Sequence, residues 1–189
     1  LTANPGLKRH VVIASIDAIR EDLMQMLQLH DRSLPVIRLY HPPPLLGLVE
    51  ALRMALGRGE LARQMIGSLP TGANALFALR FAFDSLHARA ALYLEDDILP
   101  GHYFLPSMAG SIDAVTRRPE VEARVMGILA SVGHQRCHAH ELCPTEFSPH
   151  GYVYLAKHWP AIRDEWTNWQ NWDYCVHRTQ QRQGLTSVY

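Results

Sequence analysis

Short apolar runs rich in β-branched residues alternate with longer amphipathic stretches along this chain, and this alternation limits its fold more than any other feature. The apolar runs predict buried strands at His10–Ile16, Leu34–Tyr40, Ala90–Leu94, Val125–Ala130 and Gly151–Leu155. The amphipathic stretches predict helices at about Asp17–Leu29, Leu45–Leu56, Gly59–Ile66, Asn74–His87, His102–Thr116, Lys157–Glu165 and Trp172–Gln183. Strands that alternate with helices predict an α/β domain with a mostly parallel sheet flanked by helices. In such sheets, ligands bind at the carboxyl ends of the strands.

The composition is that of a globular protein without a polyelectrolyte partner. Hydrophobic residues make up 48% of the 189 residues, and 18 basic side chains balance 18 acidic ones. This balance excludes a broad basic field for nucleic acid or an anionic membrane. No apolar run approaches the roughly 20 residues of a membrane span, so we expect membrane attachment only through a part outside this chain. We expect a single domain over residues 1–189.

Three consecutive acids follow the predicted strand Ala90–Leu94, namely Glu95, Asp96 and Asp97. Like charges so close together repel one another unless a cation binds them. Their hard oxygen ligands suit Mn²⁺ or Mg²⁺, which keeps coordination positions free for phosphate oxygens. The alternative is a solvated acidic turn in which Asp97 caps a helix.

A second acidic motif lies near the other end of the chain, where Trp172-Asp173 opens a predicted helix that ends in the sequence Gln-Arg-Gln-Gly at 181–184. Upstream, Phe147–Leu155 holds a Gly-aromatic strand. In this order, the acidic triplet, the Gly-aromatic strand and the Trp-Asp pair resemble the family of N-acetylglucosaminyltransferase I and O-mannose β-1,2-N-acetylglucosaminyltransferase. The resemblance covers Ala73–Pro100 and Phe147–Gly184.

The resemblance implies a GT-A-like (Rossmann-like) fold and inverting transfer of N-acetylglucosamine from a UDP-sugar to a glycan or glycoprotein hydroxyl. It implies that Asp97 binds Mn²⁺ directly, and that Glu95 and Asp96 hold the metal's waters and the nucleotide. Asp173 matches the family's general base, and Trp172 matches a residue of the sugar pocket. The alternative for Asp173 is a helix-terminal acid stabilised by the macrodipole.

The same resemblance assigns substrate binding to Asn74, which replaces a family histidine, and to Gly151. It implies the Golgi lumen for a eukaryotic protein, and a family portion that would follow the C-terminal end of this chain. His41 stands where the family has an acid that contacts uracil, and 129–134 replaces the family's Ser-Ala-Trp-Asn-Asp segment. These departures leave the identity of the base and of the donor sugar open.

Two other functions fit parts of the pattern. One is a nucleotidyltransferase on a similar fold, although Ile16–Ile19 lacks the Gly-rich, basic segment that such an enzyme carries after its first strand. The other is a non-catalytic carbohydrate-binding remnant, which the lost base-contact positions favour.

A third feature is the loop 133–143, which concentrates histidine and cysteine. Three predictions are open: an ordinary loop with reduced cysteines, a small loop closed by Cys137 and Cys143 with Cys175 left free, or a zinc knuckle. Arg178 and Arg182 are predicted to lie on a solvated helix face, with phosphate contact as the alternative.

Overall fold

The computed structural model describes residues 11–16, 25, 36–40, 71–95, 101–130, 143–145, 151–166 and 172–189. The chain divides into two compact units, Leu1–Phe81 and Ala82–Tyr189, and each is described by itself. Most of the predicted helices between 17 and 66 lie outside the described residues, apart from Gln25, which is helical. The expectation of one domain over residues 1–189 stays a prediction.

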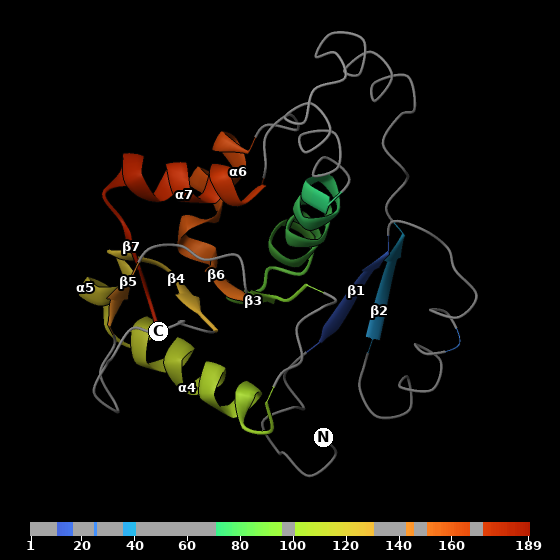
Figure 1. The fold of residues 1–189 in the computed structure, drawn as a ribbon, viewed down its shortest axis with the longest axis horizontal. Helices are drawn as coiled ribbons and strands as arrows, with labels where there is room; N and C mark the ends of the chain where they lie inside the picture. Colours follow the sequence, from blue (N-terminus) through green and yellow to red (C-terminus); the bar gives the residue numbers. More distant parts are fainter. Residues whose placement is uncertain are drawn as a thin grey trace, which may run out of the picture. The chain divides into compact units, whose positions relative to one another are not determined.

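In the first unit, β1 (Val12–Ile16) and β2 (Val36–Tyr40) form a two-stranded parallel sheet, drawn in blue in Figure 1. Val12 lies opposite Val36, and Ile16 lies opposite Tyr40. The pair confirms both strands predicted in this part of the chain. Residues 71–80 form an α-helix that passes directly into the π-helical turn η2 (Phe81–Ser85), as the amphipathic pattern of 74–87 predicts.

The second unit contains a five-stranded mixed sheet in the order β3-β6-β4-β7-β5. Its strands are β3 (Ala90–Tyr93), β4 (Val125–Leu129), β5 (Pro144–Thr145), β6 (Tyr152–Leu155) and β7 (Thr186–Val188). Only β4 and β7 pair in parallel, and the other neighbouring pairs are antiparallel. The predicted strands Ala90–Leu94, Val125–Ala130 and Gly151–Leu155 are confirmed as β3, β4 and β6, whereas the short β5 and β7 were not predicted.

The expectation of a mostly parallel, GT-A-like sheet is wrong, because this sheet is mostly antiparallel. The coarser α/β class is confirmed. The physical reason is the connection between β4 and β6. Parallel neighbouring strands need a crossover connection, which is usually a helix. The sequence between 131 and 150 predicts a long loop instead, which suits an antiparallel pair. A buried strand also has the same apolar composition in either direction, so composition alone did not reveal that β6 runs against both of its neighbours.

The helices of the second unit are α4 (Phe104–Thr116), α5 (Pro119–Glu122), α6 (Trp159–Glu165), which follows the 3₁₀ turn η3 (Ala156–His158), and α7 (Trp172–Gln183). Proline occupies the first turn of α5 and of α6, where its missing N–H would have no helical partner. The structure confirms α4, α6 and α7 as predicted, with α7 at the predicted bounds. No helix in the described part of the chain is long and apolar enough to cross a membrane.

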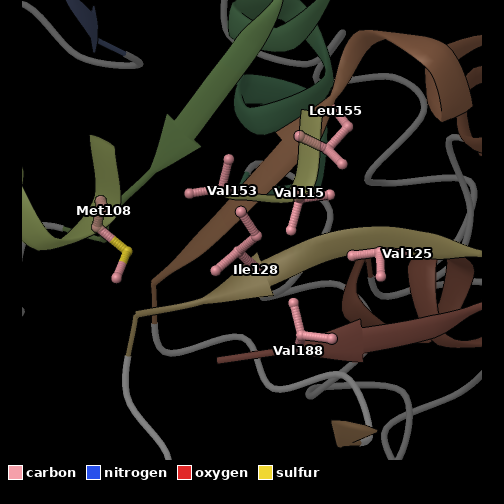
Figure 2. Close-up of a cluster of buried hydrophobic side chains, with 7 residues drawn as sticks. All are labelled: Met108, Val115, Val125, Ile128, Val153, Leu155 and Val188. Carbon is pink, nitrogen blue, oxygen red and sulfur yellow. The ribbon is translucent and has the colours of Figure 1, made fainter. Parts of the chain in front are cut away.

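Helices cover both faces of the five-stranded sheet, with α4 on one side and α6 and α7 on the other (Figure 1). On the α4 side, a buried apolar cluster joins the helix to the sheet through Met108, Val115, Val125, Ile128, Val153, Leu155 and Val188 (Figure 2). Successive side chains of a strand point to opposite faces, so Tyr152 and Tyr154 of β6 lie on the α7 side. The two faces therefore differ chemically: one is aliphatic, and the other carries aromatic hydroxyls.

Candidate functional site

The contact between Tyr93 and Trp172 joins the two motifs that the sequence analysis singled out. Tyr93 is the last residue of β3, and Trp172 is the first of α7. Their ring centroids lie 5.0 Å apart at an interplanar angle of 61°, which is an edge-to-face arrangement. Because Glu95 follows Tyr93 by two residues and Asp173 follows Trp172 directly, chain connectivity brings both carboxylates to the same region of the sheet.

Trp172 is held rigidly at this place. Its side chain is buried, and its indole stacks on that of Trp166, with ring centroids 6.2 Å apart and planes at 15°. The start of α7 is thus fixed by aromatic packing on two sides, through Tyr93 and Trp166. The predicted role of Trp172 in a sugar pocket stays a prediction.

Asp173 lies in the first turn of α7 and is partly exposed. Its Oδ1 accepts a hydrogen bond of 2.8 Å from the backbone N–H of Tyr174. A carboxylate at a helix N-terminus is also favoured by the macrodipole. The side chain is therefore oriented by local backbone, whatever further role it has.

The hydroxyl of Tyr154 lies within electrostatic reach of both motifs. Tyr154 is fully buried, and its hydroxyl has no hydrogen-bond partner among the residues that the structure describes. Burial raises the pKa of this phenol well above its ordinary value, and repulsion from Tyr152, Tyr93, Asp173 and Glu95 raises it further. The two carboxylates and the Tyr93 phenol are therefore within electrostatic reach of a hydroxyl that stays protonated and can only donate or accept as a neutral group.

Glu95 is partly buried just beyond the end of β3. Asp96 and Asp97 lie outside the described residues, so the predicted metal ligand Asp97 has no described position. No group of three possible metal ligands occurs among the residues that the structure describes. The carboxylate oxygens of Glu95 have the hard character that Mn²⁺ or Mg²⁺ requires.

Gly151 has a backbone reason for being glycine. Its φ is +79°, in the region that favours glycine, and an added Cβ would lie 2.8 Å from the Cβ of Ala130. Its carbonyl accepts a 2.9 Å hydrogen bond from the backbone N–H of Ala130. The residue thus turns the chain into β6 beside the end of β4. Its predicted part in substrate binding stays a prediction.

Asn74 belongs to the first unit and bonds to β1. Its side chain shares a short hydrogen bond with the Ser15 hydroxyl, and its Nδ2 donates to the Ser15 carbonyl at 3.4 Å. The structure does not place it with Glu95 and Asp173, because the two units are described separately. Substrate binding by Asn74 therefore stays a prediction of the resemblance.

Arg178 and Arg182, considered above as phosphate contacts, face a carboxylate of the same chain. Arg182 Nη1 donates to both oxygens of Glu165 at 2.7 and 2.8 Å, and Arg178 Nε lies 3.8 Å from Glu165 Oε2. These pairs tie α7 to α6 on a partly solvated face. Glu165 is correspondingly engaged in ion pairs.

The cysteines differ in state. Cys143 is disulfide-bonded, and Cys175 is a buried thiol outside any disulfide, as the sequence analysis predicts for a closed loop. Cys137 and most of the loop 133–143 lie outside the described residues. A sulfur in a disulfide is not the thiolate that zinc binds, so Cys143 in this state is not a zinc ligand.

Two residues of this site, Tyr93 and Tyr154, were missed by the sequence analysis. The signal was present in the alternation of Tyr152, Val153, Tyr154 and Leu155, because a buried tyrosine usually needs a partner for its hydroxyl. A tyrosine two residues before an acidic triplet was a second signal.

Comparison of the chain with models of known protein families and with curated proteins found no match. The candidate site therefore rests on its own geometry and on the motifs in the sequence.

Proposed function

We propose that this chain is a metal-dependent glycosyltransferase that moves a sugar from a nucleotide sugar to a glycan hydroxyl. The observation that carries the proposal is the Tyr93–Trp172 contact, which ties the end of β3 to the start of α7. One of these places carries the acidic triplet, and the other carries Asp173. Function belongs to such a site rather than to a fold class, so the proposal does not require a GT-A-like sheet.

Glu95, together with Asp96 and Asp97, would hold Mn²⁺ or Mg²⁺ against the diphosphate of the donor. The divalent ion, when bound, stabilises the negative charge that develops on the leaving diphosphate. The acids themselves bind and orient: three adjacent carboxylates repel one another, and a cation relieves that repulsion. The most suitable donor by resemblance is UDP-N-acetylglucosamine.

Asp173 would accept the proton of the attacking acceptor hydroxyl. The bond from the Tyr174 N–H holds Oδ1, and so orients the carboxylate while Oδ2 takes the proton. The acceptor oxygen attacks the anomeric carbon, the bond to the diphosphate breaks, and the configuration inverts in this single displacement. General-base assistance of this kind contributes about 10²- to 10⁴-fold in rate.

The test is release of UDP from UDP-N-acetylglucosamine with Mn²⁺ and a glycan acceptor. Asp173→Asn should lower the rate by about 10²- to 10⁴-fold and leave nucleotide binding near wild type. Asp164→Asn is the matched control, because Asp164 is a strongly exposed carboxylate on α6 that contacts Arg163 at 3.3 Å. This control should keep the wild-type rate.

Two outcomes would favour the other functions. Sugar binding without turnover, unchanged by Mn²⁺, would indicate a carbohydrate-binding protein. Pyrophosphate release from UTP and a sugar phosphate would indicate a nucleotidyltransferase. A wild-type rate in Asp173→Asn would exclude Asp173 as the base.

A further inference from the structure

Tyr152 and Tyr154 are two residues apart on β6, and their hydroxyls have opposite situations. Both side chains are fully buried, and their ring centroids lie 4.8 Å apart. The Tyr152 hydroxyl shares a 3.0 Å hydrogen bond with the Ser187 hydroxyl of β7. The Tyr154 hydroxyl has no partner in the described part of the chain. One tyrosine is thus satisfied within the fold, and the other is not.

A buried hydroxyl without a partner costs stability, because it has lost its hydrogen bonds to water and gained none. Phenylalanine would fill the same space without this cost. A tyrosine at this place is therefore a poor choice for packing alone. The arrangement favours a partner other than the residues that the structure describes.

The neighbours of Tyr154 indicate the kind of partner. Strand register pairs Tyr154 with Ala91 of β3 and with Gly127 of β4, two residues without a polar side chain that could bind its hydroxyl. Among the described residues, the charged groups within electrostatic reach are the carboxylates of Glu95 and Asp173. An anionic partner would be repelled here, whereas a neutral hydroxyl or carbonyl oxygen would not. Sugars present such groups.

The position of Tyr154 relative to the two carboxylates indicates which part of a nucleotide sugar its hydroxyl would contact. In the proposed reaction, Glu95 is on the side of the metal and the diphosphate, and Asp173 is on the side of the attacking hydroxyl. The transferred sugar lies between these two sides, because its anomeric carbon is bonded first to one and then to the other. Tyr154 pairs with Ala91, which lies two residues before Tyr93 on the same face of β3, and Tyr93 contacts Trp172 beside Asp173. Tyr154 therefore lies on the part of the sheet that carries both carboxylates, where the transferred sugar would bind.

We propose that Tyr154 is a sugar-binding residue, whose buried hydroxyl donates a hydrogen bond to a neutral oxygen of the transferred sugar. This inference rests on the proposed function and adds a residue that sets donor selectivity. Tyr154 takes no part in proton transfer. Its role is to distinguish a nucleotide that carries a sugar from one that does not.

The test compares Tyr154→Phe with Tyr152→Phe, each of which removes one hydroxyl from one buried tyrosine. The affinities of UDP-N-acetylglucosamine and of UDP are measured by calorimetry with Mn²⁺ present. Tyr154→Phe should lower the affinity for UDP-N-acetylglucosamine by about three- to tenfold, as expected for the loss of one hydrogen bond. The affinity for UDP should change by less than about twofold. Tyr152→Phe should leave the ratio of the two affinities at the wild-type value.

Urea unfolding of the same variants gives a second readout that does not depend on a ligand. Tyr152→Phe should lower the unfolding midpoint, because the buried Ser187 hydroxyl then loses its 3.0 Å hydrogen bond and keeps only the 3.5 Å one to Gln180 Oε1. Tyr154→Phe should leave the midpoint unchanged or raise it. A midpoint lowered as far as in Tyr152→Phe would mean that the Tyr154 hydroxyl has a partner within the protein, and would overturn the inference.

The binding outcomes separate this inference from the proposed function. If wild type binds UDP-N-acetylglucosamine and Tyr154→Phe binds it equally well, the inference fails and the proposed function stands. If Tyr154→Phe lost affinity equally for UDP and for UDP-N-acetylglucosamine, the inference would also be overturned, because the hydroxyl would then bind the nucleotide and not the sugar. If wild type binds no nucleotide sugar, both fail.

Discussion

The indole Nε1 of Trp159 donates a 2.8 Å hydrogen bond to Asp84 Oδ1, joining residues 75 positions apart. Phe83 stacks on the same indole, with ring centroids 5.1 Å apart. The contact ties η2, which precedes β3, to the start of α6, which follows β6. Because β3 and β6 are paired, the hydrogen bond links the segment before β3 to the segment after β6. It thus supports the strand that leads to the acidic triplet.

Removing this acceptor should destabilise the fold. Asp84→Ala leaves the buried Trp159 N–H without a partner, and we expect the free energy of unfolding to fall by about 1–3 kcal/mol. The ion pair of Asp84 with Arg163, at 3.5 Å, is partly exposed and adds little. Urea unfolding measures the change. Asp113→Ala is the control: it removes an exposed ion pair with Arg117, and its effect should stay below about 0.5 kcal/mol.

Gly127 of β4 should not accept even a methyl group. An added Cβ would lie 2.3 Å from the carbonyl oxygen of Val153 and 2.4 Å from the ring of Tyr152. The first contact is with backbone of the neighbouring strand, so it cannot be relieved by a side-chain rotation. We expect Gly127→Ala to cost at least about 1–3 kcal/mol.

Gly110 on α4 is the matched control for this substitution. No atom lies within 4 Å of its added Cβ, and it is exposed in the interior of a helix. Gly110→Ala should stabilise the protein by about 0.5–1 kcal/mol, because alanine favours the helix. Equal effects at the two glycines in urea unfolding would contradict the packing described for β4 and β6.

The stability of the fold should fall at alkaline pH through Tyr152 and Tyr154. Burial raises the pKa of both phenols above the ordinary value of 10.0. Below that pH, both are protonated in the folded and the unfolded chain, so their contribution is fully present. Above it, the unfolded chain releases protons that the folded chain keeps, and stability falls until the folded pKa is passed.

Each tyrosine should contribute a loss that approaches about 1.4 kcal/mol per pH unit. Unfolding free energies at about pH 8 and about pH 11 measure the fall, and Tyr154→Phe should show a smaller one than wild type. If the unfolding free energy of Tyr154→Phe falls as much as that of wild type, Tyr154 ionises in the folded protein as it does in the unfolded chain.

The sequence predicted the elements near the site better than their pairing. Trp172–Gln183 was predicted with its observed bounds because its amphipathic pattern and a following Gly184 mark both ends. The direction of β6 was mispredicted, since strand direction is a tertiary property that apolar composition does not encode. The two-residue β5 was missed because so short a segment has no periodicity, and it is held by backbone pairing with β7.

The site was predicted in part for a similar reason. The sequence could mark Glu95 and Asp173 as unusual acids, but only the fold places the Tyr93 and Trp172 rings in contact and so relates the two motifs. Tyr154 was passed over because a tyrosine in a buried strand looks like packing. That its hydroxyl has no partner among the described residues follows only from the three-dimensional structure.

The most direct test of the central claim is a calorimetric titration of UDP with Mn²⁺ present and with a chelator. The account predicts that the chelator lowers UDP affinity at least about tenfold, or about 1.4 kcal/mol, because metal and diphosphate complete one another's binding. Asp97→Asn should lose this coupling, and Asp173→Asn should retain it. UDP binding that is indifferent to the chelator, or unchanged in Asp97→Asn, would contradict the account.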